Sequence, residues 1–592
     1  MHNLSNLARL DQGTPLLNPM QELTPYEHAA EAIKQWLDGL GAEFAARSKK
    51  HHRLRKMDAW DIELPHPIGV QTVQLSISPD FPVTPPEVHF DRALCLAWPH
   101  VEETGRFCHG VEPAAEDYEN PKAVFEEVLQ RLSEFWLLTQ DPLWVENEFH
   151  NERLSYWHRF CSRHREVTGS APPKLARVQF HPIEKPTGGL LAAYFSHSKK
   201  LASDLILTTI GESDPHAVAV RHKWSKGSLV RGHSLFLPMS EAHRWTPFSW
   251  PVNFADLAHL VGQLTGESSY LEEWINGKAE KKKQMFLVVL VQSNVNYGYL
   301  ITPPVVNRLT IPGVIPVALD RVDTDWMLAR DHQLPVLHKR RSTRVLLLGC
   351  GSLGSSVAEL LARAGVGELH LVDKELLEPE NCARHLLGAD SVDLGKASQL
   401  ASELRKKIPG VSIRAFWAMI GDWVPATCCP GQYDLVVDCS GESSIRSMLS
   451  RFRARCFGDA AVAHAWMEPF CAAAHVVYVG AVDSWPANDP YEKVNVAHWS
   501  QTGAVSLPAC GSGFHPYGSA DAWQAAGFVV ERLLSVLDGQ VTGATVWSWI
   551  RSSAFFDALG VDVRQGPLVP VSPYAFDAVQ KTRTLGEVLG VA

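Results

Sequence analysis

Apolar positions near the N-terminus adopt helical spacing after a stretch that shows no period. Residues 1–20 lack a clear apolar pattern and are expected to form a loose tail. A helix is predicted to begin after Thr24, with Pro25 in its first turn and Glu27 completing a capping box. Over residues 30–44 the apolar side chains recur at the spacing of one helix face, which favours an amphipathic helix.

The next segments alternate between apolar and polar residues, which is typical of half-buried strands. Residues 60–64 and 70–77 both show this alternation, and the proline-rich segment 79–86 ends it. Residues 121–160 return to helical spacing and are rich in aromatic side chains. Together these segments predict an α+β domain over residues 21–165.

The middle of the chain, residues 166–335, is strand-rich and contains no internal repeat. Continuous apolar runs at residues 205–210 and 285–291 predict buried strands. The lysine-rich run 278–283 is interpreted as a solvated loop rather than a partner-binding patch. We therefore expect a separate middle domain without recognisable chemistry.

From residue 342 onward the pattern becomes strand, glycine-rich turn, helix and strand. Residues 345–348, 368–373 and 433–438 are near-continuous apolar runs, as expected for central strands of a parallel sheet. This order is typical of a doubly wound α/β fold. Residues 336–592 are therefore predicted to form a Rossmann-like α/β domain, which makes the whole chain an α/β and α+β multidomain protein.

Length and composition agree with several globular domains in one chain. The 592 residues favour three or four domains, and 45% hydrophobic residues exclude a disordered protein. A net charge of −10 gives no support to nucleic-acid binding. The longest apolar run, 285–291, is far shorter than the roughly 20 residues that span a bilayer, so no membrane association is expected. Because the first residues lack the apolar core of a signal peptide, we expect a cytoplasmic protein.

The eleven cysteines show no regular spacing and include no Cys-x-x-Cys pair. A secreted disulfide framework would be denser, and a structural zinc site would need paired ligands. Most of these thiols are expected to be buried packing residues in a reducing compartment. Their neighbours must indicate which of them are nucleophiles.

A glycine motif connects the first predicted parallel strand to the following helix. Gly349, Gly351 and Gly354 form a Gly-x-Gly-x-x-Gly turn, and the acidic Asp373 follows Gly354 after nineteen residues. Such glycines let backbone amides approach phosphates at a helix N-terminus, and the acid can accept hydrogen bonds from ribose hydroxyls. The motif predicts nucleotide binding but does not separate an NAD site from an ATP site.

Charged residues downstream of this motif favour ATP. Adenylation of a carboxylate builds negative charge at the α-phosphate and expels pyrophosphate, so it needs cationic clamps. Here the sequence resembles the ubiquitin-activating and ThiF/MoeB-like adenylating family, in its Glu378–Arg384 stretch and its Gly395-Lys396 pair. The resemblance implies that Asn381 and Arg384 contact phosphates, and that Lys396 neutralises the leaving pyrophosphate.

The sequence departs from that family at the residues expected to bind Mg²⁺. The family usually carries a second aspartate where Gly441 stands in this chain. Asp438 or Glu442 can take the place of that ligand, and we assign the metal role to Asp438. The implied cofactors are ATP and Mg²⁺.

Members of the family that continue to a thioester carry a cysteine in a loop before a late helix. This chain has Cys510 among small residues at 507–514, before a helix predicted at about 521–537. A thiolate in such surroundings is accessible to an acyl adenylate. The resemblance therefore assigns the thioester to Cys510, whereas Cys350, Cys382 and Cys439 are interpreted as packing residues.

A second candidate nucleophile lies near the N-terminus. The segment 80–90 and the following Trp98–Cys108 stretch resemble the proline element and active cysteine of ubiquitin-conjugating enzymes. His100 stands eight residues before Cys108, where that family has an asparagine that supports the oxyanion. A histidine there can donate the same hydrogen bond or transfer protons, and the sequence leaves both open. His109, beside Cys108, is a candidate for favouring the thiolate.

The two resemblances together describe one reaction sequence in a single chain. The whole resembles the conjugating–activating fusion proteins of bacterial antiphage (CBASS) operons. That resemblance implies that ATP activates the C-terminal carboxylate of a partner protein, which passes through Cys510 and Cys108 to a target amine. It also implies that the partner is a cyclic-nucleotide synthase (CD-NTase), and that the activating domains pair as a homodimer.

Three other interpretations remain open at the level of sequence. A ThiF/MoeB-like sulfur-carrier adenylating enzyme would share the C-terminal motifs but has no use for the N-terminal domain. An NAD-dependent oxidoreductase is supported by the glycine turn alone, because Arg384 and Lys396 suit phosphates better than a nicotinamide. A scaffold with an inactive conjugating fold is disfavoured by the spacing of His100 and Cys108.

Overall fold

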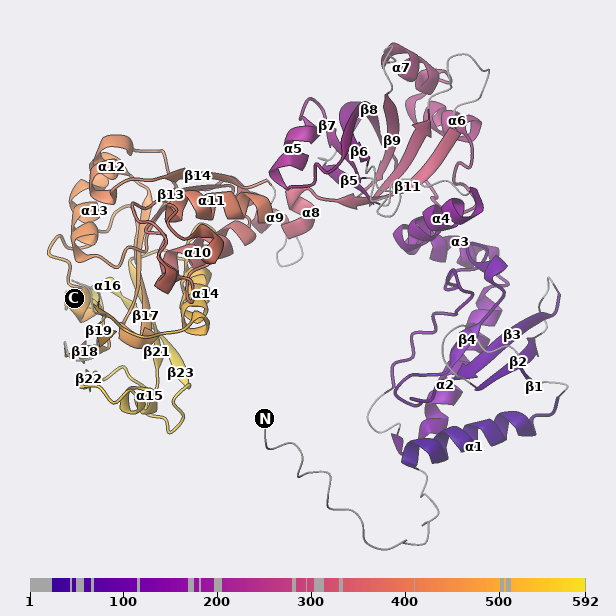
Figure 1. Cartoon of the computed structure of the whole chain (residues 1–592), viewed down its shortest axis with the longest axis horizontal. Helices are drawn as coiled ribbons and strands as arrows, with labels where there is room; N and C mark the ends of the chain where they lie inside the picture. The colour runs from indigo at the N-terminus through magenta and orange to yellow at the C-terminus, as the bar shows by residue number, and fades with distance from the viewer. Residues whose placement is uncertain are drawn as a thin grey trace, which may run out of the picture.

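The computed structural model shows three successive units, and the middle one lies between the other two (Figure 1). The described residues are 24–42, 45–48, 58–64, 66, 69–113, 118–168, 175–179, 183–195, 205–278, 284–293, 295–302, 313–328, 334–408, 410–500, 505–506 and 513–590. The expectation of a mixed α/β multidomain protein is thus confirmed. Among these residues no helix combines the length and the apolarity needed to cross a membrane.

The N-terminal unit packs helices against a four-stranded antiparallel sheet in the order β1-β2-β3-β4. Thr24 caps the first helix and Glu27 completes its capping box, as the sequence predicts. Trp60, Phe81 and Phe125 lie fully buried in the shared core. The elements are α1 (Pro25–Gly39), β1 (Ala45–Arg47), β2 (Asp58–Leu64), β3 (Gln71–Ile77), β4 (Glu87–His89), α2 (Pro121–Leu138), α3 (Pro142–Asn151) and α4 (Arg153–Thr168).

The middle unit is a closed barrel with the strand order β10-β11-β5-β7-β6-β8-β9. The predicted strands at residues 205–210 and 285–291 are present as β7 and β9. The strands are β5 (Leu175–Gln179), β6 (Thr187–Phe195), β7 (Leu205–Ile210), β8 (Ser228–Pro238), β9 (Met285–Gln292), β10 (Val295–Thr302) and β11 (Gly313–Arg321). The helices of this unit are α5 (Pro215–Arg221), α6 (Phe254–Thr265) and α7 (Tyr270–Lys278).

Helix α4 joins the N-terminal unit to the barrel through one shared hydrophobic core. Trp157 on α4 is fully buried, and its indole nitrogen donates to the carbonyl oxygen of Val317 on β11 at 3.2 Å. Its ring also packs on Trp250 and Tyr299. The residue pair 165/166, where the sequence suggests a domain boundary, falls inside this helix.

The C-terminal unit is built on an eight-stranded sheet in the order β14-β13-β12-β15-β16-β17-β21-β23. Strands β14 through β16 are parallel, and β17, β21 and β23 continue the sheet antiparallel. The strands are β12 (Arg344–Leu348), β13 (Glu368–Val372), β14 (Ser412–Phe416), β15 (Leu435–Asp438), β16 (Ala461–Met467), β17 (Ala473–Val479), β18 (Ala497–Trp499), β19 (Val505–Ser506), β20 (Gly513–Phe514), β21 (Thr545–Arg551), β22 (Val563–Gln565) and β23 (Ala578–Thr584).

Helices cover this sheet, and the parallel strands end at one common edge. The helices are α8 (Thr324–Leu328), α9 (Leu334–Arg341), α10 (Ser352–Arg363), α11 (Lys396–Lys407), α12 (Ile420–Thr427), α13 (Ser443–Cys456), α14 (Ser519–Leu537), α15 (Ser553–Ala558) and α16 (Leu585–Leu589). In doubly wound sheets, ligands bind outside the carboxyl ends of the parallel strands. That edge is formed here by the residues that follow β12, β13 and β15.

Among the described residues, the barrel contacts the C-terminal unit through His222, and α8, which follows the last barrel strand, packs on the segment before β14. The imidazole Nδ1 of His222, at the end of α5, lies 3.0 Å from the carbonyl oxygen of Lys406 on α11. Thr324 packs against Gly410, where a Cβ atom would lie 1.6 Å from the threonine hydroxyl oxygen. Gly410 also has φ +80°. Glycine is therefore favoured here both by the backbone conformation and by the lack of space for a Cβ atom.

Candidate active site

The glycine turn after β12 is shaped by what each glycine faces. Gly349 has φ +85°, and a Cβ atom there would lie 2.8 Å from Cα of Ser440. A Cβ on Gly354 would lie 2.0 Å from the carbonyl oxygen of Gly349, so this glycine lets α10 pack against the turn. Gly351 caps α10 and has no heavy atom within 4 Å of its Cβ position. The open side of the turn is therefore the one where a phosphate can meet the helix N-terminus.

Asp373 follows β13 and is held by the backbone of this turn. Its Oδ2 accepts a hydrogen bond from the Cys350 amide at 2.6 Å, and its Oδ1 accepts one from the Glu375 amide at 2.7 Å. Burial raises the pKa of the Asp373 carboxyl, and the two backbone hydrogen bonds act in the opposite direction. The carboxyl group is thereby fixed at the edge where the sequence places a ribose.

A cavity of about 260 Å³ opens at this edge. Gly349, Gly351 and Asp373 line one part of it, while Met419 and Ile445 belong to a more apolar part. An apolar end beside a turn rich in backbone amides suits a base and its phosphates. The complete lining is Gly349, Gly351, Asp373, Lys374, Glu375, Ala418, Met419, Ile420, Gly421, Cys439, Ser440, Glu442, Ser444 and Ile445.

The other three nucleotide residues expected from the sequence differ in their placement. Lys396 is buried, and its Nζ donates at 2.6 Å to Oε2 of Glu375, a residue that lines the cavity. Arg384 lies beside the cavity, with its guanidinium 5.2 Å from the ring centroid of Tyr517. Asn381 accepts a hydrogen bond from the Glu378 amide at 3.2 Å in a local capping box, and it does not line the cavity. The phosphate roles of these residues stay predictions.

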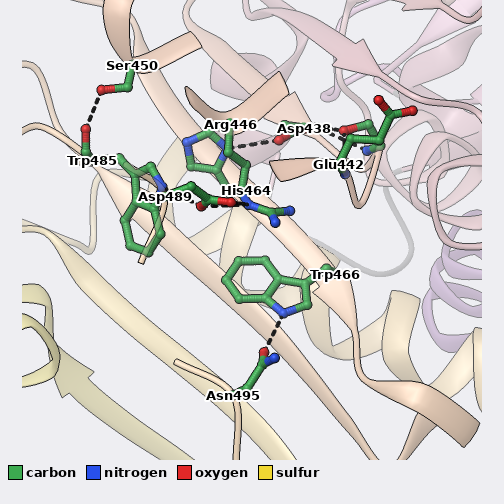
Figure 2. Close-up of polar contacts among 10 residues, drawn as sticks. Asp438, Glu442, Arg446, Ser450, His464, Trp466, Trp485, Asp489 and Asn495 are labelled. Atoms are coloured by element: carbon green, nitrogen blue, oxygen red, sulfur yellow. Dashed lines mark hydrogen bonds and ion pairs between the residues drawn. The ribbon is translucent and has the colours of Figure 1, made fainter. Parts of the chain in front are cut away.

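Asp438 is fully committed to hydrogen bonds inside the protein. Its Oδ1 accepts from the amide and hydroxyl of Ser440, and its Oδ2 lies 3.0 Å from Nδ1 of His464 (Figure 2). Burial opposes ionisation of Asp438, but the hydrogen bonds from His464 and Ser440 dominate and lower its pKa. Asp438 has only 1% of its surface exposed and does not line the cavity, and its role as a Mg²⁺ ligand stays a prediction. Glu442, which is exposed and lines the cavity, is the better placed carboxylate.

A groove of about 540 Å³ adjoins the cavity and shares Gly351, Cys439 and Ser440 with it. Arg384 borders this groove, and aromatic side chains form much of its wall. The complete lining is Gly351, Ser352, Leu353, Arg384, Cys439, Ser440, Gly441, Ser443, Arg446, Ala465, Trp466, Met467, Glu468, Pro469, Phe470, Tyr491, Asn495, His515 and Tyr517. An extended polypeptide in this groove would end at the glycine turn.

Sequence reasoning missed Arg446, a buried cation in the wall of this groove. Its Nε donates to both carboxylate oxygens of Asp489 at 2.9 and 3.0 Å. The guanidinium lies over the ring of Trp466, with a centroid distance of 5.0 Å (Figure 2). It also lies over the ring of Tyr491, with a centroid distance of 5.2 Å. The partners of Arg446 are distant in sequence. The one signal in the sequence is therefore its position on the buried face of α13, which it shares with Leu449.

The cysteines of this unit fall into two groups. Cys350 and Cys439 are buried, and burial raises the pKa of both thiols, which agrees with a packing role. Cys510, the predicted thioester residue, lies outside the described residues. The strands β19 and β20 on either side of it pair with each other, and α14 begins at Ser519. The role of Cys510 stays a prediction.

Cys108 is exposed at the end of a tight loop in the N-terminal unit. Its amide donates to the carbonyl oxygen of His100 at 2.8 Å, and Val101 pairs with Phe107 across the loop. Gly105 has φ +88°, and a Cβ there would lie 2.2 Å from the carbonyl oxygen of Phe90, the residue that follows β4. The loop therefore holds the backbones of His100 and Cys108 together.

The two histidine rings near Cys108 are directed to other partners. Nε2 of His100 lies 3.3 Å from Oε1 of Glu148, and its Nδ1 lies 3.9 Å from Oε2 of Glu152. His109 accepts from the Val111 amide through Nδ1, so its Nε2 carries the proton and donates to the Pro86 carbonyl oxygen at 3.1 Å. Burial lowers the pKa of His109, which keeps the ring neutral. His109 therefore does not provide the cation that would favour a Cys108 thiolate.

Comparison with known proteins gives a family for part of the chain. The ThiF family model matches residues 326–465, which include the glycine turn, Asp373 and Asp438. A protein of Enterobacter hormaechei named ATP-dependent ubiquitin transferase-like protein Cap2 is 38% identical over 113 residues, or 19% of each chain. Its namesake in Vibrio cholerae is 32% identical over 139 residues, or 23% of each chain.

Two further comparisons concern a mouse protein and a solved bacterial structure. Mouse adenylyltransferase and sulfurtransferase MOCS3 is 35% identical over 150 residues, which is 24% of this chain and 32% of that protein. The crystal structure of Escherichia coli MccB with MccA-N7isoASN aligns at 14% identity and a TM-score of 0.29, over 41% of this chain and 71% of MccB. The chain thus matches less than a third of the length of the Cap2 relatives. The C-terminal half of the chain contains a ThiF family domain.

Proposed function

We propose that this chain uses ATP to activate the C-terminal carboxylate of a partner polypeptide and then transfers that acyl group to an amine. The observation that carries the proposal is the junction of the nucleotide cavity with the neighbouring groove. Both are lined by Gly351, Cys439 and Ser440. A nucleotide in one and a polypeptide end in the other would meet at the N-terminus of α10.

Adenylation at this junction requires that the developing charge be stabilised. A carboxylate oxygen of the polypeptide attacks the α-phosphorus of ATP, the bond to the β-phosphate bridging oxygen breaks, and pyrophosphate leaves. The amides at the start of α10 face the open side of Gly351, where they can donate to the phosphate. Arg384 borders the groove and Lys396 is bonded to Glu375 of the cavity wall, and we assign these two cations to the phosphates.

The acyl group then moves along thiols. The Cys510 thiolate attacks the acyl carbonyl and AMP leaves; the Cys108 thiolate attacks the resulting thioester and releases Cys510. An amine finally attacks the Cys108 thioester, forms an amide, breaks the carbon–sulfur bond to release the Cys108 thiolate, and loses its proton to solvent. The exposure of Cys108, and the short loop that holds it beside His100, support its role as the acceptor.

The partner is proposed to be a protein with a C-terminal glycine, of the CD-NTase class that the sequence resemblance implies. The relatives named ubiquitin transferase-like support transfer of a polypeptide rather than of a small acid. The name of MOCS3 keeps a sulfur-carrier adenylating enzyme as the alternative. The two differ in whether an acyl group reaches Cys108.

The test combines ATP–pyrophosphate exchange with non-reducing gels of the full-length chain. The probe is a CD-NTase ending in glycine, and the same protein without its last residue is the control substrate. We expect exchange with the complete substrate, a thiol-sensitive adduct on the parent chain, and loss of the Cys108 adduct in Cys510→Ala. Exchange should persist in Cys108→Ala, because adenylation precedes the first thioester.

Two results would contradict the proposal. Exchange without any adduct on Cys108 would favour the sulfur-carrier alternative. Absence of exchange together with tight NAD binding would remove adenylation altogether.

A further inference from the structure

A cluster of metal-ligating side chains lies beside the Cys108 loop, away from the nucleotide cavity. His100, Glu148 and Glu152 each offer one ligand atom, and these atoms all lie within 4.8 Å of one another. His100 comes from the loop, whereas Glu148 belongs to α3 and Glu152 caps its C-terminal end. One imidazole nitrogen and two carboxylates form a mixed donor set, which suits divalent first-row transition metals.

The spacing of the donors agrees with direct coordination. Nε2 of His100 and Oε1 of Glu148 are 3.3 Å apart. Ligands bound tetrahedrally at about 2.0–2.2 Å from a zinc ion lie roughly 3.3–3.6 Å from each other. Oε2 of Glu152 lies 3.9 Å from Nδ1 of the His100 ring, so this 45% exposed side chain must turn toward Nε2 to add a third bond.

The charge of the cluster also calls for a cation. Glu148 and Glu152 are one helical turn apart, and like charges at this spacing repel each other. Among the described residues, the ion pairs of both carboxylates are made with His100. One imidazole carries at most a single positive charge against two carboxylates, whereas a divalent ion balances both.

We propose that His100, Glu148 and Glu152 bind a divalent transition-metal ion, with water completing its coordination, and that this ion clamps the Cys108 loop to α3. The backbone already prepares the site, because the His100 amide donates to the buried Tyr156 hydroxyl at 2.8 Å. The carbonyl oxygen of the same residue accepts from the Cys108 amide. A metal on the imidazole would thus fix the residue to which Cys108 is bonded. The site is independent of the proposed adenylation.

The test is a Co²⁺ titration of the full-length, metal-stripped protein, followed by visible absorption and repeated with Zn²⁺ as competitor. Glu148→Gln and Glu152→Gln remove one donor each. Glu146→Gln changes the same charge on the same helix outside the cluster and serves as the matched control. Weak sites elsewhere are common to all variants and cancel in the comparison.

We expect the parent and Glu146→Gln to bind one more equivalent of Co²⁺ than Glu148→Gln or Glu152→Gln, with affinity reduced by roughly 100-fold or more in those two. Changes in groups that merely support metal ligands already cost 10–100-fold. Cys108→Ser should bind like the parent, since the thiol is not a ligand. Identical titrations of all four glutamate forms, or loss of binding in Cys108→Ser, would overturn the proposal. Equal thermal unfolding of the variants in EDTA excludes misfolding as the cause.

Discussion

At the scale of single residues, two glycines of the glycine turn, three positions apart, have different structural roles. Gly354 has backbone atoms where a side chain would start, whereas Gly351 faces open space. The same exchange to alanine therefore tests packing at one position and ligand access at the other. Each of the two alanine variants therefore serves as the control for the other.

We expect Gly354→Ala to lower the free energy of unfolding of the C-terminal unit by about 1–3 kcal/mol, the usual range for overpacking. Gly351→Ala should stay within about 1 kcal/mol of the parent, since its new methyl group meets no protein atom. Its ATP affinity should fall about tenfold or more, because the methyl group occupies the phosphate approach. Urea unfolding and nucleotide titration measure the two effects. Equal ATP affinity of Gly351→Ala and the parent would contradict the phosphate assignment.

The neutral ring of His109 gives the Cys108 loop a defined response to pH. Burial lowers its pKa below the ordinary 6.5, so folding favours the uncharged ring. The stabilisation is complete above pH 6.5 and is lost as the pH falls through the lower folded value. A charged ring would donate from both nitrogens, and the Val111 amide would lose its acceptor.

Amide exchange around residues 107–111 should therefore accelerate between about pH 6.5 and pH 5 beyond the intrinsic pH trend of exchange. His109→Gln should show no such excess, since glutamine does not titrate. Hydrogen–deuterium exchange with mass spectrometry, corrected for intrinsic rates, measures both. An excess of the same size in the variant would assign the response to another group.

At the scale of elements, α4 links two units that the sequence presents as separate. Its amphipathic pattern predicts a buried face, but not that this face packs on a barrel. The partner of Trp157 at Val317 is 160 residues away in the chain. Local patterns thus predicted several helices and strands and the capping box at Thr24, whereas the contacts that join them depend on residues far apart in sequence.

Trp157→Ala should destabilise both units together, by about 3–5 kcal/mol, the usual cost of removing a buried tryptophan. Hydrogen exchange should accelerate in α4 and also in β10 and β11, because Trp157 packs on Tyr299 and bonds to Val317. His158→Ala, an exposed neighbour on the same helix, is the control and should leave both unchanged. Faster exchange confined to α4 would show that the core is not shared.

The same division between local and distant signals applies to the site. The glycine turn and Asp373 were predictable because nucleotide chemistry requires them at fixed spacing in one strand–turn–helix unit. Arg446 was not, since its carboxylate partner Asp489 comes from a loop forty-three residues later. Asp438 also shows the limit of a motif: it ends a strand as the sequence predicts, but the sequence does not show that its carboxylate contacts His464 and Ser440.

At the scale of the whole molecule, the barrel lies between the N-terminal unit, which carries Cys108, and the C-terminal unit (Figure 1). Two contacts lie where the chain passes from the barrel to the C-terminal unit: Thr324, at the start of α8 after β11, packs on Gly410, and His222 of the barrel bonds to the carbonyl oxygen of Lys406. Gly410 combines a positive φ with a close neighbour. Gly431 has nearly the same φ, +77°, and no heavy atom within 4 Å of its Cβ position.

Gly410→Ala should therefore loosen the barrel from the C-terminal unit, and Gly431→Ala should not. Both variants carry the backbone strain of a left-handed alanine, so the difference between them reports the contact with Thr324. Small-angle X-ray scattering should show a larger radius of gyration for Gly410→Ala alone. Equal radii for the two variants would mean that the remaining contacts suffice to hold the units together.

The core that α4 shares with the barrel also affects how the chain folds as it is synthesised. The ribosome releases α3 and α4 first, but the strands that cover Trp157 and its aromatic neighbours follow more than a hundred residues later. Until then a large apolar face stays open to solvent and to chaperones. A gene fragment that stops near residue 165 would keep that face permanently uncovered, and a soluble N-terminal piece therefore requires the barrel in the same reading frame.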